Sequence, residues 1–141
     1  MLTNGAPKIV TCTLGYNAHK TRCFTWISVG YYDEFIWIRK EGEEYSDTNK
    51  FESFKVGDNR TSTKNWNDSI YNRIRGITTD GTPFTTHKII KDFDEPTAGT
   101  TQKYYYKVGR DGFQTEERAF TIRNRSDLVT NGFNFLQVTD Q

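Results

Sequence analysis

The side chains best suited to chemistry in this sequence are two cysteines, two histidines and a cluster of carboxylates. Cys12 and Cys23 lie on the first two expected strands, and they would face each other if these strands formed a hairpin around residues 16–18. Such a pair would be either a short-loop disulfide or two reduced, partly buried thiols. Placing Cys12 opposite Cys23 also turns Val10 away from the face of Trp26, so we favour the reduced pair and leave the disulfide open.

The histidines and the clustered carboxylates complete no catalytic or metal site in the sequence. His19 lies in the first expected turn and is predicted to be solvated. His87 lies on an expected strand with no Ser or Cys nucleophile motif beside it, so it is predicted to be exposed or at the edge of a pocket. Neither histidine completes a ligand set, and the carboxylates of residues 41–44 are typical of a charged turn. We therefore expect no cofactor and no enzymatic activity in this chain, and leave open the activity of any longer parent protein.

Composition and charge favour one all-β domain. The 141 residues are enough for a single domain with a sizeable core. Aromatic residues make up 15% of the chain, and rings pack well on a pleated sheet. A mean hydropathy of −0.79 favours sheets with one solvated face. The net charge of +1 and the lack of a long apolar run lead us to expect no nucleic-acid partner and no membrane insertion.

The clearest strand pattern is formed by Tyr104, Tyr106 and Val108, which occupy every second position. After a turn at residues 109–112, the pattern resumes at residues 119–122, so the segment is predicted to be a β-hairpin. The other expected strands are residues 7–14, 20–29, 34–41, 51–56, 84–93 and 133–138.

This succession of short strands, about eight in all, predicts an antiparallel β-sandwich with Greek-key connections. Residues 57–69 form the most polar stretch and are expected to be a long exposed loop or an insertion. We expect residues 1–132 to form the sandwich. Residues 133–141 are expected to be a terminal strand or a linker to a following domain.

Three segments together resemble a known family. They are the strand that contains Trp26, the run from residue 84 through Phe93, Pro96 and the tyrosines to Gly109, and the segment Ala-Phe-Thr-Ile at residues 119–122. The combination is similar to fibronectin type III and other immunoglobulin-like domains, and most of all to the N-terminal domain of purple acid phosphatases and related metallophosphoesterases. The chain departs from that pattern in having Phe93 where Leu is usual, extra residues after Pro96, and Arg110 in place of Asp.

The resemblance implies a fibronectin type III-like, immunoglobulin-like sandwich with the scaffold residues Trp26, Phe93, Pro96, Tyr104, Tyr106 and Phe120. It implies that Tyr104 buries its ring at a corner and returns its hydroxyl to an upstream backbone group; otherwise the tyrosines only alternate in burial. It also implies that Asp140 is the first metal ligand of a catalytic domain following Gln141. The Asp-x-His pattern of that family is absent and one carboxylate cannot hold two metals, so a solvated terminal acid is the other interpretation.

Aromatic residues in expected turns are the candidate binding residues, because exposed turn aromatics anchor partners; they are Tyr31, Tyr32, Trp66 and Phe113. We expect a non-catalytic structural or accessory module of a larger protein or assembly, bound to another protein domain, an assembly subunit or a surface glycan. One alternative is the N-terminal domain of a metal-dependent phosphoesterase. The other is a decoration or adhesion domain of a bacteriophage virion, which the Lys-, Asn-, Thr- and Tyr-rich composition would suit. An extracellular or virion location is expected rather than a cytoplasmic one.

Overall fold

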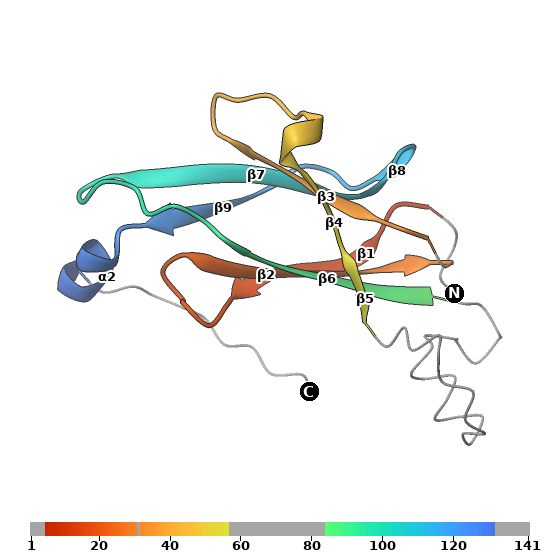
Figure 1. Ribbon diagram of the computed structural model, residues 1–141, viewed down its shortest axis with the longest axis horizontal. Helices are drawn as coiled ribbons and strands as arrows, with labels where there is room; N and C mark the ends of the chain where they lie inside the picture. The colour runs from red at the N-terminus through yellow and green to blue at the C-terminus, as the bar shows by residue number, and fades with distance from the viewer. Residues whose placement is uncertain (1–4, 31, 57–83, 132–141) are drawn as a thin grey trace, which may run out of the picture.

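Two antiparallel sheets stacked face to face form most of the described part of the computed structural model, which covers residues 5–30, 32–56 and 84–131 (Figure 1). One sheet has the order β1 (Lys8–Leu14), β2 (Thr21–Val29), β6 (Phe84–Asp92) and β5 (Phe54–Val56). The other has the order β4 (Lys50–Glu52), β3 (Phe35–Lys40), β7 (Thr101–Arg110) and β8 (Phe113–Gln114), and β9 (Arg118–Arg123) also pairs with β7. We call them the β2 sheet and the β7 sheet.

The strand order confirms the predicted fold class. In immunoglobulin-type sandwiches, strands A, B, E and D form one sheet and strands C, F and G form the other. Here β1, β2, β6 and β5 take the first four places, and β3, β7 and β9 take the other three. The chain crosses between the layers after β2, after β4 and after β6, which gives the Greek-key path.

The core lies between the sheets and is built from the inward-facing positions of four strands. Its buried members are Phe24, Trp26, Ile36, Ile38, Tyr104, Tyr106, Val108 and Ile122. Phe93 and Phe120 pack against this cluster, with the Phe120 ring stacked 5.2 Å from the Tyr104 ring. Pro96 is half-buried at the end where β9 leads into the helix, and its carbonyl accepts a 2.9 Å hydrogen bond from the Asn124 amide. Of the residues expected to form the scaffold, all except Pro96 therefore lie in or against one aromatic core.

The segment 51–56, predicted as one edge strand, is two strands in different sheets. Residues 50–52 pair with β3, whereas residues 54–56 pair with β6. Ser53 makes the crossing, and its backbone N–H donates a 2.9 Å hydrogen bond to the Glu34 carbonyl. A period-two pattern continues unchanged through such a crossing, so the sequence pattern did not reveal it. The prediction was wrong at this point.

The register of the first hairpin excludes the disulfide. Cys12 lies opposite Phe24, and Cys23 lies opposite Thr13, so the two cysteines are on opposite faces of the β2 sheet. Both are free thiols. The parity argument from Trp26 therefore pointed to the correct alternative.

Two further segments differ from the expected pattern. The tyrosine strand β7 continues through Arg110, so the turn covers only residues 111–112. The polar stretch before residue 132 contains a short helix, α2 (Arg125–Asn131), which lies at the end of the sandwich opposite β8 (Figure 1). Asn124 accounts for its start, because the Asn124 side-chain oxygen accepts a 2.9 Å hydrogen bond from the Ser126 backbone N–H, as an N-cap does. A single 3-10 turn, η1 (Asp47–Asn49), precedes β4.

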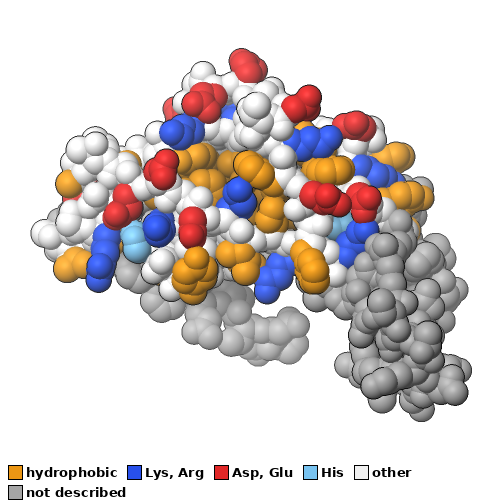
Figure 2. All heavy atoms as spheres, in the orientation of Figure 1, with side chains coloured by type: hydrophobic (Ala, Val, Ile, Leu, Met, Phe, Trp, Pro, Cys, Tyr) orange, Lys and Arg blue, Asp and Glu red, His pale blue; other side chains and the backbone are white. Residues whose placement is uncertain are grey.

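Several expectations fall outside the described residues: the polar loop of residues 57–69 and the last strand at residues 133–138. Within the described ranges, no helix has the length and apolar character needed to cross a membrane. Hydrophobic side chains reach the surface in the middle of the face seen in Figure 2, with charged side chains of both signs among them.

Candidate functional site

A stack of two aromatic rings around one guanidinium group forms the candidate site. The Cζ atom of Arg110 lies 3.9 Å from the ring centroid of Tyr32 and 4.4 Å from that of Phe113. Tyr32 comes from the connection between β2 and β3, and Phe113 begins β8, so the stack joins two connections at one end of the sandwich. Tyr32 is 44% exposed and Phe113 is 38% exposed. Cation–π contacts of this kind hold all three groups in place while both rings stay open to solvent.

Glycines allow the backbone to approach the ring of Tyr32 and the backbone of Phe113. Gly30 has a φ of +92°, and a Cβ atom at that position would lie 2.4 Å from the ring of Tyr32. Gly109 has a φ of +129°, and a Cβ atom there would lie 2.1 Å from the carbonyl oxygen of Phe113. Real Cβ atoms do not come so close, and a positive φ is costly for other residues. The geometry of the stack therefore requires glycine at both positions.

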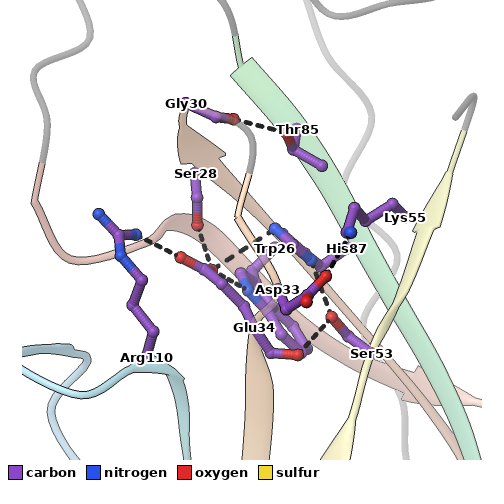
Figure 3. A network of polar contacts seen from close by, with 10 residues as sticks. All are labelled: Trp26, Ser28, Gly30, Asp33, Glu34, Ser53, Lys55, Thr85, His87 and Arg110. Carbon is purple, nitrogen blue, oxygen red and sulfur yellow. Dashed lines mark hydrogen bonds and ion pairs between the residues drawn. The ribbon is translucent and has the colours of Figure 1, made fainter.

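Glu34, a fully buried carboxylate directly before β3, fixes the position of Arg110 (Figure 3). Its Oε2 atom accepts a 2.7 Å hydrogen bond from Nη1 of Arg110, which also makes the two groups an ion pair. Its Oε1 atom accepts a 2.8 Å bond from the indole N–H of Trp26 and a further bond from the hydroxyl of Ser28. A buried charge is tolerated only when it is paired and hydrogen-bonded. Glu34 meets both conditions, with donors from β2 and β7.

His87 closes the other side of this network. Its ring is fully buried and stacks on Trp26 at a centroid distance of 5.4 Å. The Nε2 atom lies 3.6 Å from Oε1 of Glu34, and Nδ1 lies 2.8 Å from the hydroxyl oxygen of Ser53. That hydroxyl is also 2.8 Å from the Glu34 backbone carbonyl oxygen. The expectation of an exposed or pocket-edge histidine was wrong.

The protonation of His87 follows from these neighbours. The Ser53 hydroxyl has one hydrogen and donates it to the Glu34 backbone carbonyl, so its oxygen accepts from His87, and we infer that the ring hydrogen sits on Nδ1. The Nε2 atom, 3.6 Å from Oε1 of Glu34, has no hydrogen-bond partner in the described part of the chain. Burial lowers the pKa of His87 to about 4, although the charge of Glu34 acts in the opposite direction. His87 is therefore neutral at pH 7.

Ser53, His87 and Glu34 are the residue types of a hydrolytic triad, but their arrangement does not support one. Ser53 and His87 are both buried, so a substrate has no path to the hydroxyl. The hydroxyl contacts Nδ1, whereas the Ser-His-Asp arrangement uses Nε2 and leaves Nδ1 to the carboxylate. The Ser53 hydroxyl instead bridges Nδ1 of His87 and the backbone carbonyl of Glu34 between the sheets.

The structure brings together two of the four predicted binding aromatics, Tyr32 and Phe113. Tyr31 and Trp66 lie outside the described residues, as does the candidate metal ligand Asp140. His19 is half-buried in the first turn, 3.9 Å from the carboxylate of Glu95, rather than fully solvated. No group of three or more His, Cys, Asp or Glu residues able to hold a metal ion occurs in the described ranges.

Sequence reasoning missed the roles of Arg110, Glu34 and His87, although strand parity contains a signal for Arg110 and Glu34. Arg110 continues the even-numbered series that is buried on β7, and Glu34 continues the even-numbered series that is buried on β3. Phe35 pairs with Gly109 at the end of the antiparallel ladder between β3 and β7. Glu34, which precedes Phe35, and Arg110, which follows Gly109, therefore lie at the same end of that ladder. The alternation on each strand places both side chains on the inward face, and a cation and a carboxylate that meet there predict a buried ion pair.

We compared the chain with protein-family models, with curated proteins and with solved structures, and none of them matches it. The resemblance to fibronectin type III domains and to the N-terminal domain of purple acid phosphatases therefore stays a prediction.

Proposed function

We propose that this chain is a non-catalytic, immunoglobulin-like accessory module of a larger protein or assembly, and that it binds another protein through the stack of Tyr32, Arg110 and Phe113. The observation that carries the proposal is the exposure of both rings around a guanidinium group that a buried carboxylate already holds. Tyr and Arg are among the residues that dominate binding energy at protein interfaces. Connections at the ends of sandwich folds are common recognition surfaces, because the sheets hold them rigid.

Pre-organisation is the physical reason for choosing this cluster over a single exposed ring. An isolated surface arginine or tyrosine loses rotamer freedom when a partner immobilises it, and this weakens binding. Here the rings are fixed against Arg110, and Arg110 is fixed by Glu34. The partner therefore meets a surface that is already ordered.

A separate alternative, a phosphoesterase domain after Gln141, gains no support from the described residues, since Asp140 lies outside them.

Site-specific photocrosslinking in cells that naturally make the protein tests this proposal. A benzophenone amino acid replaces Tyr32 in one variant, Phe113 in a second and Tyr16 in a control. Tyr16 is a suitable control because it is 77% exposed and lies in the turn before β2, whereas Tyr32 follows β2. We expect one shared adduct from Tyr32 and Phe113 that is absent from Tyr16 and that excess unlabelled wild-type protein removes. Equal crosslinking at Tyr16, or no adduct at either ring of the stack, would refute the proposed surface.

The non-catalytic part of the proposal has its own test. The purified chain is incubated with p-nitrophenyl phosphate in the presence of added Mn²⁺, Zn²⁺ or Fe³⁺, and we expect no turnover above the metal-only blank. Turnover that rises in proportion to the protein concentration would contradict the proposal.

A further inference from the structure

The outer face of the β7 sheet carries a second group of cations and aromatic rings, separate from the stack described above. On β3 and β7 the even-numbered residues point into the core, so the odd-numbered residues point outward. Lys50 of β4 lies opposite Trp37, which lies opposite Lys107 of β7. Arg39 lies opposite Tyr105 in the next outward row. We define the cationic face as Arg39, Lys50, Lys103 and Lys107.

Each cation of this face lies over an aromatic ring. The ammonium nitrogen of Lys50 is 4.3 Å from the ring centroid of Phe35 and 5.3 Å from that of Trp37. The ammonium nitrogen of Lys107 is 5.8 Å from the Trp37 ring, so two lysines flank one indole. Similar contacts hold Arg39 and Lys103 over the ring of Tyr105, at 4.3 and 5.0 Å. Aromatic contacts of this kind restrict the side chains, so the positive charges are held in a fixed array.

One carboxylate of the chain already shows how this face receives an acid. Glu117 accepts hydrogen bonds of 3.1 to 3.3 Å from the guanidinium group of Arg39 and one of 2.7 Å from the hydroxyl of Tyr45. These bonds, with Tyr45 as the largest contributor, lower the pKa of Glu117. A carboxylate that docks against a ring-supported cation is therefore an interaction that the fold itself uses here.

No lysine of the face is hydrogen-bonded to a carboxylate in the described residues, although the charge of Lys107 also helps to lower the pKa of Glu117. Within the described residues, Lys50, Lys103 and Lys107 contact rings and form no ion pair. On the strands themselves the outward carboxylate is Glu52, the neighbour of Lys50 on β4. The ammonium groups of Lys50, Lys103 and Lys107 are therefore held by rings and not by ion pairs, which leaves them available to acidic groups of another molecule.

We propose that the cationic face binds a carboxylate-rich surface of a protein partner. Complementary charge is the first reason, and the docking of Glu117 on Arg39 is the second. The covered rings argue against single-stranded nucleic acid, whose bases need free aromatic faces for stacking. Trp37 is only 7% exposed and has lysine ammonium groups against it. This surface lies on β3, β4 and β7 and does not include the Tyr32 stack. The binding proposed here can therefore be refuted without refuting the proposed function, and the reverse also holds.

A fluorescein-labelled oligoglutamate peptide, titrated with the full chain and followed by fluorescence anisotropy, tests the proposal. The face variant carries Lys50→Gln and Lys107→Gln. The control variant carries Lys8→Gln and Lys88→Gln, which change the net charge equally but lie on the β2 sheet. We expect saturable binding that weakens with added salt and a loss of about tenfold in affinity for the face variant, the effect of two exposed ion pairs. The control variant should stay close to wild type.

Three results would overturn the proposal: no saturable binding, an equal loss in both variants, or competition by heparin or oligo-dT that is stronger than competition by unlabelled peptide. An equal loss would mean that only net charge matters, and stronger competition would mean a different class of polyanion. If thermal denaturation shows that the face variant is unstable, Lys50→Met with Lys107→Met replaces it. Methionine keeps an apolar stem against the rings and removes the charge, so this pair should also lose about tenfold, and retained affinity would refute the proposal.

Discussion

Replacement of Glu34 by alanine is the most informative perturbation of this molecule, because one carboxylate connects the core to the exposed stack. The change removes the acceptor for the indole N–H of Trp26 and for the hydroxyl of Ser28, and it leaves Arg110 without its buried partner. A buried donor that loses its acceptor costs about 1 to 3 kcal/mol. Removing one member of a buried ion pair costs about 3 to 5 kcal/mol in total. We therefore expect Glu34→Ala to lower the free energy of unfolding by about 4 kcal/mol.

Urea denaturation at pH 7, followed by tryptophan fluorescence, measures this loss as a shift of the midpoint at constant slope. Glu117→Ala is the matched control, because Glu117 also accepts from an arginine and from a neighbouring aromatic side chain, Tyr45, but is exposed. Exposed ion pairs contribute little to stability, so the control should unfold near the wild-type urea concentration. If Glu34→Ala and Glu117→Ala had the same midpoint, the buried network would not hold the sandwich together as we argue.

Three further predictions concern His87, Gly109 and Cys12. Because burial lowers the pKa of His87 from 6.5 to about 4, the unfolded chain binds a proton that the folded chain does not, so stability should fall by about 3 kcal/mol as the pH drops through this window. Urea melts of wild type and His87→Gln at several pH values measure this, and an equally steep fall in the variant would contradict it. Gly109→Ala should destabilise the fold by about 2 kcal/mol or more, because the new Cβ meets the Phe113 carbonyl. Gly99→Ala, whose φ is also positive but whose Cβ meets nothing within 4 Å, should cost about 1 kcal/mol, and equal losses in urea melts would exclude the clash. Burial raises the pKa of Cys12 to about 11, so its alkylation at pH 8 should be slow in the folded protein and rapid in urea. Equal rates measured by mass spectrometry would show that Cys12 is not buried.

The sequence predicts much of the fold because alternation directly reports which face of a strand is buried. Tyr104, Tyr106 and Val108 were recognised as one buried face, and the structure confirms all three. The same alternation extends to Arg110, but charged residues are mostly exposed, so it was interpreted as part of a turn. Alternation gives the face of a residue and not its partner across the molecule. The pair of Arg110 with Glu34 therefore required the strand register.

Other features depend on contacts that no local pattern contains. The crossing at Ser53 leaves the alternation of β4 and β5 intact, and only the pairing with β3 and with β6 separates them. The burial of His87 follows from its place opposite Trp26 on β2, which a single strand cannot reveal. Tyr32 and Phe113 were both selected as turn aromatics, but they are far apart in the sequence, and only the structure brings them to one cation.

The one-residue crossing at Ser53 has a consequence for the way this protein unfolds. Because β4 belongs to one sheet and β5 to the other, neither layer can detach without breaking the pairing of the strand next to it in the sequence. The Ser53 hydroxyl also contacts the buried histidine of β6, so loosening the crossing opens the interior as well. Small single domains usually unfold in one cooperative transition, and this crossing couples the two layers in that transition. The two sheets should therefore exchange their protected amide hydrogens at a common rate, as a single cooperative unit.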